Sequence, residues 1–222
     1  MSTFSRAFEL AHFLFPQGGT CLEFGVYAGG TYCWQAQRML DAYKNDQLVG
    51  YDSWQGLPPE ADGVWAPDRH AAGRFASPKE CVLSRLSGMR AIGPRFRLVD
   101  GFFKDSLTEA ERCNVGEVIF INIDVDIYSS TIELLNFVEP LLRPGVVLYW
   151  DDWQDPNDDH PNEWGERKAW HDWISQHSQF GAETMEVNAI NQRTMMITKT
   201  PTATMDHGRI ADIRYRLVSM SQ

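Results

Sequence analysis

Short apolar runs alternate with stretches of helical periodicity along most of this chain. The runs at residues 20–24, 47–51, 95–99, 118–123 and 146–150 are short and bounded by turn residues, as expected of buried strands. Between them, apolar residues recur at the three- and four-residue spacing of amphipathic helices. This alternation predicts an α/β fold with parallel strands, because strands joined through a crossover helix point the same way.

One long internal segment, residues 53–76, interrupts this pattern. It is rich in glycine, proline and tryptophan and shows neither the short apolar runs of strands nor the apolar spacing of helices. An irregular loop of that length is uncommon in a compact domain and often acts as a lid or a binding loop. Ahead of the first strand, apolar residues at helical spacing predict a helix over about residues 3–15, which we expect to cover either the sheet or a substrate.

The C-terminal part of the chain is less regular. Residues 163–177 have helical periodicity, and residues 181–189 and 193–198 predict two final strands joined by a turn. Residues 200–222 show no clear pattern. Within them, residues 213–218 could form a strand or an oligomer contact.

Composition and charge narrow the classes of protein. The 222 residues, 43% of them hydrophobic, can bury one good core, so we expect residues 1–222 to form a single domain. A net charge of −10 without any basic stripe makes nucleic acid an unexpected partner. There is no apolar run of about 18 residues and no signal-peptide pattern, and the four cysteines are scattered without a CxxC pair. We therefore expect a cytoplasmic protein with reduced cysteines, no zinc site and no membrane span.

Aspartates follow two of the buried strands. Asp124 comes directly after residues 118–123, and Asp151 and Asp152 come directly after residues 146–150. A helical stretch joins the two strands, so these aspartates are expected to meet at the carboxyl edge of the sheet, where open α/β proteins bind ligands. Three carboxylates that converge in this way require a cation or protons.

A glycine-rich turn and a further aspartate predict a nucleotide-type site at the same edge. The turn that begins at Gly25 lies between the first strand and a helix, where glycines let the backbone approach a ligand and the helix N-terminus offers free N–H groups. Such a turn also occurs without a ligand. Asp52 ends the second strand, 27 residues after Gly25, where a carboxylate can accept hydrogen bonds from ribose hydroxyls. Asp100 and Gly101 fall on the same edge.

With these motifs, the chain resembles the class I S-adenosylmethionine-dependent methyltransferases, and among them the TylF/MycF (macrocin O-methyltransferase) family. The resemblance covers about residues 20–175 and implies a Rossmann-like α/β sandwich, in which helices on both faces cover a seven-stranded, mostly parallel sheet with an antiparallel last strand. The resemblance rests on five stretches of sequence. They are EFGVYAGGT at 23–31, YDSWQGLP at 51–58, GFFKDSL at 101–107, IDVDIYSST at 123–131, and PG at 144–145 followed by the aspartates at 151–152.

The resemblance also implies individual roles. Asp52 would hold the ribose. Asp124, Asp151 and Asp152 fall where the family, like the catechol-type enzymes, binds a divalent cation, usually Mg²⁺, and Asp124 would also act as general base. The methionine end of the cofactor would lie against Glu23, Gly25 and Gly29, and the adenine against Asp100, Gly101 and Phe102. The implied cofactor-binding residues are Glu23, Gly25, Tyr27, Gly29, Thr31, Asp52, Ser53, Asp100, Gly101, Phe102 and Asp124.

We therefore expect a metal-dependent O-methyltransferase that acts on a hydroxyl of a small secondary metabolite, with a sugar or glycoside as the leading acceptor. A bound cation lowers the pKa of a hydroxyl and orients it, and oxygen-only ligands suit Mg²⁺ better than zinc. A catechol- or phenol-type enzyme is the alternative. A pseudoenzyme or scaffold is a second alternative, although three carboxylates would destabilise a site that binds no cation. Relatives imply a homo-oligomer, either a dimer or a tetramer.

Two further acidic features have alternative interpretations. Asp126 could be a fourth carboxylate of the group, but we favour it as the cap of the following helix. The acidic run at residues 155–159 is expected to be a solvated loop, although it could also recruit a cationic substrate.

Histidines and tryptophans supply the remaining candidates. His160 and His171 could act as bases, but we expect both at the surface. Trp54, Trp153 and Trp164 lie in loop-like contexts and are equally expected as pocket walls or as core packing.

Overall fold

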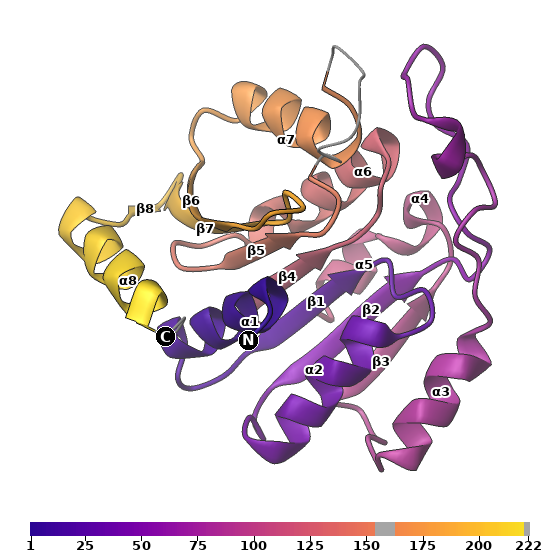
Figure 1. Cartoon of the computed structure of the whole chain (residues 1–222), viewed down its shortest axis with the longest axis horizontal. Coiled ribbons are helices and arrows are strands. Elements are labelled where there is room, and N and C mark those ends of the chain that lie inside the picture. The colour runs from indigo at the N-terminus through magenta and orange to yellow at the C-terminus, as the bar shows by residue number, and fades with distance from the viewer. Residues whose placement is uncertain (154–162, 220–222) are drawn as a thin grey trace.

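The strands form one mixed sheet in the computed structural model, which describes residues 1–153 and 163–219 (Figure 1). Their order is β3-β2-β1-β4-β5-β7-β6, and β8 pairs with β7. The first five are parallel, whereas β7 runs antiparallel to both β5 and β6. This confirms the predicted sheet and adds one two-residue strand. The strands are β1 (Thr20–Phe24), β2 (Gln47–Asp52), β3 (Phe96–Asp100), β4 (Val118–Ile123), β5 (Val147–Trp150), β6 (Gly181–Val187), β7 (Arg193–Thr200) and β8 (Ala203–Thr204).

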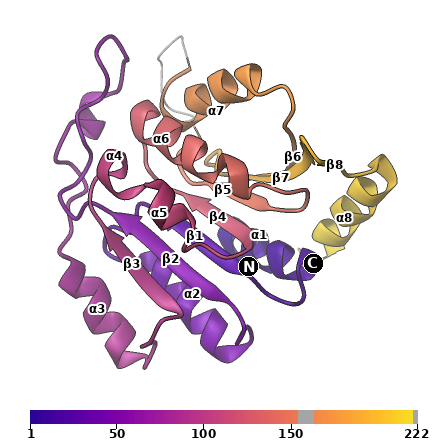
Figure 2. The same ribbon diagram turned by 180° about the vertical axis from the view of Figure 1, so that it is seen from behind.

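Helices cover both faces of the sheet (Figure 1, Figure 2). Successive strand residues point to opposite faces, so Phe120 joins the core under α1 and α2, whereas Ile121 joins the core under α6 and α7. No helix within the described residues is long and apolar enough to cross a membrane. The helices are α1 (Thr3–Leu14), α2 (Gly30–Asp41), η1 (Asp68–His70), α3 (Lys79–Gly88), α4 (Phe103–Ser106), α5 (Glu109–Arg112), α6 (Tyr128–Val138), η2 (Glu139–Leu141), α7 (Gly165–Gln176) and α8 (His207–Ser219).

The leading helix α1 covers the sheet. Phe4 and Phe8 pack edge-on against Phe120, with ring centroids 5.8 and 5.6 Å apart, and Phe4 also contacts Tyr149. Of the two expectations for this helix, cover for the sheet is therefore the one observed.

The C-terminal residues form a helix, so of the two alternatives for residues 213–218 the strand is wrong, and the oligomer contact stays a prediction. Ile210, Ile213 and Leu217 are buried in the same core as α1. Their spacing of three and four residues places them on one face of a helix. Residues 213–218 alone are too short to show this helical spacing, because Ile210 lies outside them.

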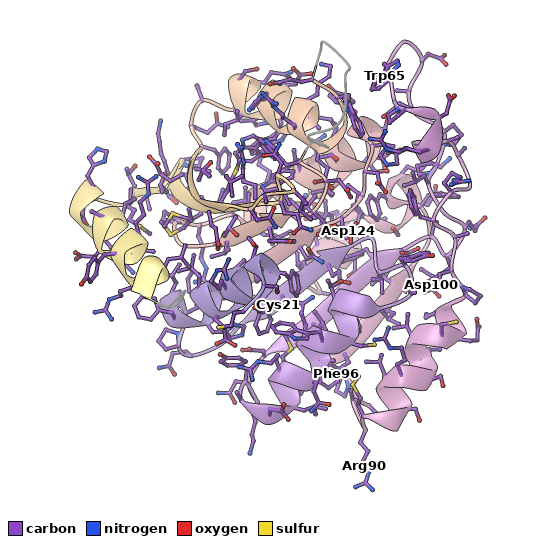
Figure 3. The ribbon with its side chains drawn as sticks, viewed as in Figure 1. Cys21, Trp65, Arg90, Phe96, Asp100 and Asp124 are labelled. Atoms are coloured by element: carbon purple, nitrogen blue, oxygen red, sulfur yellow. The ribbon has the colours of Figure 1, made fainter. Side chains whose placement is uncertain are left out.

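The long loop at residues 53–76 is irregular except for the single turn η1. Its two ends are tied together, because Leu57 donates a backbone hydrogen bond to Arg74 and Gly73 donates one back to Leu57, both 2.9 Å long. The loop rises beside the carboxyl ends of the strands, with Trp65 near its tip (Figure 3).

Candidate functional site

The carboxyl ends of the five parallel strands bring the motif residues into one row. Beyond the last strand residues, the backbone N–H groups of Asp151, Asp124, Gly25 and Gly101 each donate to the neighbouring strand. Across β5, β4, β1, β2 and β3 the row therefore reads Asp151, Asp124, Gly25, Asp52, Gly101. Asp124 lies at the middle of the molecule (Figure 3).

A cavity of about 360 Å³ opens along this row. That volume suits a small-molecule ligand. Its polar wall includes the carboxylates that follow β4 and β5. Apolar side chains, among them Leu57, Phe75, Phe102 and Phe103, supply much of the remaining wall. The cavity can thus hold a ligand with both a polar group and an apolar surface.

Three carboxylates meet as predicted. Asp124, Asp151 and Asp152 each offer an oxygen within 4.8 Å of the others. Burial, followed by repulsion from its aspartate neighbours, raises the pKa of Asp124 well above its usual range. Burial and the charge of Asp151 raise the pKa of Asp152 to about 6. Bringing a cation into this group would relieve both effects.

Glu166 holds the loops that carry these carboxylates. This side chain from α7 is fully buried and accepts backbone N–H bonds from Val125 at 3.0 Å and from Asp152 at 3.2 Å. The bonds link the loop after β4 to the loop after β5. Glu166 was not predicted from the sequence, and its position on a helical stretch gave no signal of this role.

Asp126 lines the cavity, so the prediction that it caps α6 is wrong. Ile127 occupies the cap position, and Glu60 of the long loop supplies the capping carboxylate instead. Glu60 accepts the N–H of Tyr128 at 2.9 Å and that of Ser129 at 3.0 Å. Burial and the charges of Asp152 and Asp151 raise the pKa of Asp126 to about 8.

His70 of the long loop also reaches the cavity. It is 8% exposed, and its Nε2 lies 3.1 Å from Oδ1 of Asp126. The sequence offered no motif that singles it out. Only its place in a long, glycine- and proline-rich loop was a signal.

The glycine turn and the acidic group are in direct contact. Gly25 has a φ of +85°, and a β-carbon at this position would overlap the carbonyl oxygen of Asp124. Glycine is therefore required here both for conformation and for close approach.

Asp52 lines the cavity and organises its neighbours. One carboxylate oxygen accepts the backbone N–H of Tyr27 and the other accepts that of Trp54, both at 2.7 Å. Burial raises the pKa of Asp52, and these backbone bonds oppose the rise. Ser53 lies next to it in the cavity wall.

The predicted site residues fall into two groups. Gly25, Tyr27, Asp52, Ser53, Gly101, Phe102, Asp124, Asp151 and Asp152 line the cavity. Glu23, Gly29, Thr31 and Asp100 do not. Glu23 is fully buried behind the glycine turn, where it accepts hydrogen bonds from the Thr31 hydroxyl at 2.8 Å and from the Gln35 amide. Gly29 begins α2 in the left-handed conformation, and Asp100 pairs with Lys79 at 2.5 Å.

The tryptophans pack rather than line the cavity. Trp153 and Trp164 are 1% and 4% exposed, and the Trp54 indole donates to Asp100 at 2.9 Å. His171 is half-exposed on α7 and contacts Glu163, as expected of a surface histidine. His160 and residues 155–159 lie outside the described residues.

Comparison with known proteins follows this geometry. A family model described as a methyltransferase domain matches residues 22–153. The chain is also 29% identical over 142 residues to 8-demethyl-8-(2,3-dimethoxy-alpha-L-rhamnosyl)-tetracenomycin-C 4'-O-methyltransferase of Streptomyces olivaceus. That match covers 61% of this chain, and it spans about half of the relative, 53% of its length.

Solved structures share the fold. The O-methyltransferase NovP superposes with a TM-score of 0.67 at 21% identity, over 89% of this chain and 79% of NovP. CalS11, a calicheamicin methyltransferase, superposes with a TM-score of 0.62 at 21% identity, over 86% of this chain and 78% of CalS11. Because the family model matches more than half of the sequence, from the first strand to the acidic group after β5, this chain belongs to the family of methyltransferase domains.

Proposed function

We propose that this chain is an S-adenosylmethionine-dependent O-methyltransferase that acts on a sugar hydroxyl of a natural-product glycoside. Its family supports methyl transfer, and the Streptomyces olivaceus relative, a methyltransferase of a rhamnosyl tetracenomycin, supports the sugar acceptor. The observation that carries the proposal is one cavity that joins Asp52 and the glycine turn to the group of Asp124, Asp151 and Asp152.

We assign the methyl donor to the part of the cavity over β1, β2 and β3. Asp52 between two glycine-containing turns, at Gly25 and Gly101, fits a nucleoside at the carboxyl edge of a parallel sheet. Tyr27, Ser53 and Phe102 line the same part of the cavity. When bound, S-adenosylmethionine supplies an electrophilic methyl group on sulfur.

The other predicted cofactor residues act from outside the cavity in this proposal. Glu23 and Thr31 brace the glycine turn from behind through their hydrogen bond. Gly29 lets α2 begin where the turn ends, and Asp100 holds Lys79 and Trp54 at the rim.

We assign a divalent cation, with Mg²⁺ as the leading candidate, to Asp124, Asp151 and Asp152. Their buried, all-oxygen donor set fits a hard cation. A cation bound there would lower the pKa of an acceptor hydroxyl and orient it. The chain holds these carboxylates in place through Glu166, and Gln192 donates to Asp151 at 2.5 Å.

The proton of the acceptor hydroxyl requires a base. We propose Asp124 for this role, because it is the central carboxylate of the row and touches the glycine turn. Asp126 is the second candidate, because it faces the cavity without being one of the three grouped carboxylates. Asp126→Asn at saturating Mg²⁺ separates the two, because this variant removes none of the three grouped carboxylates and should lose turnover only if Asp126 is the base.

A mass-spectrometric screen with S-adenosylmethionine and a panel of glycosides and phenols tests the proposal directly. Methylated glycosides are expected. Methylation of phenols alone would move the assignment to a catechol-type enzyme.

Calorimetry with S-adenosylhomocysteine tests the cofactor independently of any acceptor. Absence of binding at high concentration would overturn the methyltransferase assignment for this chain. Full activity in EDTA would overturn only the assignment of a catalytic cation and would leave the methyltransferase assignment in place.

A further inference from the structure

The loop segment at residues 57–74 makes polar contacts at two places in the chain that immediately follows β4. Glu60 caps the start of α6, and His70 meets Asp126. These contacts lie on either side of Ile127. The loop is therefore attached at two points to the segment that carries the acidic group.

Glu60 caps the N-terminus of α6 although it lies far from this helix in the sequence. Its two carboxylate oxygens accept the N–H groups of Tyr128 and Ser129, and the Ser129 hydroxyl donates to it as well. A carboxylate at a helix N-terminus is also favoured by the helix dipole. Because Ile127 offers no side-chain oxygen, α6 depends on the loop for its cap.

The His70 contact is enclosed by aromatic rings. Its imidazole centroid lies 5.2 Å from that of Trp164 and 5.8 Å from that of Phe75. Trp164 also contacts Trp65 of the loop, with centroids 5.7 Å apart. The ring of His70 is thus fixed on two sides while Nε2 faces Asp126.

Asp126 is held in a conformation that needs such support. Its φ of +61° is uncommon for a residue with a side chain. Its carbonyl oxygen lies so close to Gly165 that a β-carbon at that position would overlap it. Strained backbone of this kind persists where surrounding contacts over-determine it, and it is typical of functional sites. Here the constraint aims a carboxylate into the cavity beside Asp152.

We propose that His70 is a positioning residue that holds the Asp126 carboxylate toward the acceptor, and that Glu60 keeps the 57–74 loop docked so that His70 can do so. This inference rests on the proposed methyl transfer, but the docking itself does not. The acceptor site is complete only when the loop lies on α6.

Hydrogen exchange measured by mass spectrometry tests the docking without any substrate. Glu60→Ala should speed exchange of the Tyr128 and Ser129 amides and of the 57–74 loop, whereas Asp62→Asn, an exposed carboxylate in the same loop, should not. Unchanged protection in Glu60→Ala would overturn the docking.

Steady-state kinetics test the positioning role. His70→Phe keeps an aromatic ring but removes the contact with Asp126, so kcat should fall about tenfold or more, as for loss of a hydrogen bond to a charged group. His70→Gln can restore a donor near the position of Nε2 and should recover much of that loss. The dissociation constant for S-adenosylhomocysteine should stay the same in both variants.

The outcomes separate the two levels of the inference. Equal kcat in His70→Phe and wild type would overturn the positioning role, and so would equal losses in His70→Phe and His70→Gln. If the wild-type protein methylated no acceptor, the proposed function and the positioning role would both fall, while the exchange data would still decide the docking.

Discussion

At the scale of single residues, the site depends on how closely two backbones approach. Gly25 and the Asp124 carbonyl are in contact, so the parts of the cavity that we assign to the donor and to the acceptor meet where there is no room for a side chain. The glycine turn was predicted as a ligand cradle. Its contact with Asp124 follows from the parallel pairing of β1 with β4.

Gly25→Ala should therefore be strongly destabilising. Overpacking costs about 1–3 kcal/mol and a left-handed φ adds about 1 kcal/mol, so we expect the free energy of unfolding to fall by at least about 2 kcal/mol. Urea denaturation measures this. Gly30→Ala is the matched control, because a β-carbon there meets nothing within 4 Å and alanine favours the helix. Equal stability of the two variants would contradict the structural argument.

Glu23 should give the protein a measurable pH dependence. Burial raises its pKa from 4.5 to about 8, so the folded state holds a proton that the unfolded state releases. The contribution of this group to stability is therefore fully present below pH 4.5 and is lost as pH rises to about 8. Glu23→Gln should remove that loss, so the stability of the variant relative to wild type should increase over this range in urea denaturation at a series of pH values. Parallel curves for the two proteins would contradict it.

At the scale of elements, helices are attached by side chains from distant segments. Glu60 caps α6, Glu166 of α7 ties two strand ends, and His12 of α1 meets Asp46 ahead of β2. His12 and Asp46 are 6% and 1% exposed and lie 2.6 Å apart. Asp46 also accepts the N–H of Gly19, so it joins α1 to the turns at the amino ends of β1 and β2.

Asp46→Ala should loosen α1. Removing one partner of a buried hydrogen bond costs about 1–3 kcal/mol, because the remaining polar group is left unsatisfied, and Asp46→Ala also removes the acceptor of the Gly19 N–H. Glu117→Ala removes the exposed partner of Arg143 and should cost about 1 kcal/mol or less. Thermal and urea denaturation compare the two. A cost for Asp46→Ala as small as that for Glu117→Ala would show that α1 is held by apolar packing alone.

At the scale of the whole molecule, one edge of the sheet carries the two groups of residues that we propose bind the methyl donor and the cation. The strands β1, β2 and β3 carry the glycine turns and Asp52, and β4 and β5 carry the acidic group. The two parts meet where Gly25 lies against Asp124, and we expect a substitution in one part to leave binding at the other unchanged.

Two variants test this separation. Asp52→Asn should weaken S-adenosylhomocysteine binding about tenfold or more while leaving the increase in melting temperature caused by MgCl₂ unchanged. Asp151→Asn should abolish that increase and leave S-adenosylhomocysteine binding within about threefold of wild type, a difference of less than 1 kcal/mol. Calorimetry and thermal shift assays read the two properties, and loss of both in either variant would show that the parts are coupled.

The amino-acid sequence was sufficient to predict the parallel strands of the sheet and the placement of Asp52, Asp124, Asp151 and Asp152 at one edge. Apolar runs locate buried strands, and a helix between two runs forces the strands to be parallel. Residues that follow such strands must then share one edge. Local periodicity and chain connectivity carry the information on the strands and their shared edge, whereas the antiparallel last strand was implied by the family resemblance.

Only the folded chain decided how the long loop completes the site. Glu60 and His70 lie in a segment without periodicity, and each meets a partner more than fifty residues away. Asp126 was predicted as a cap because aspartate favours that position, but Glu60 fills the position and leaves Asp126 to face the cavity. The path of an irregular loop depends on which distant groups it satisfies, and no local pattern records that choice.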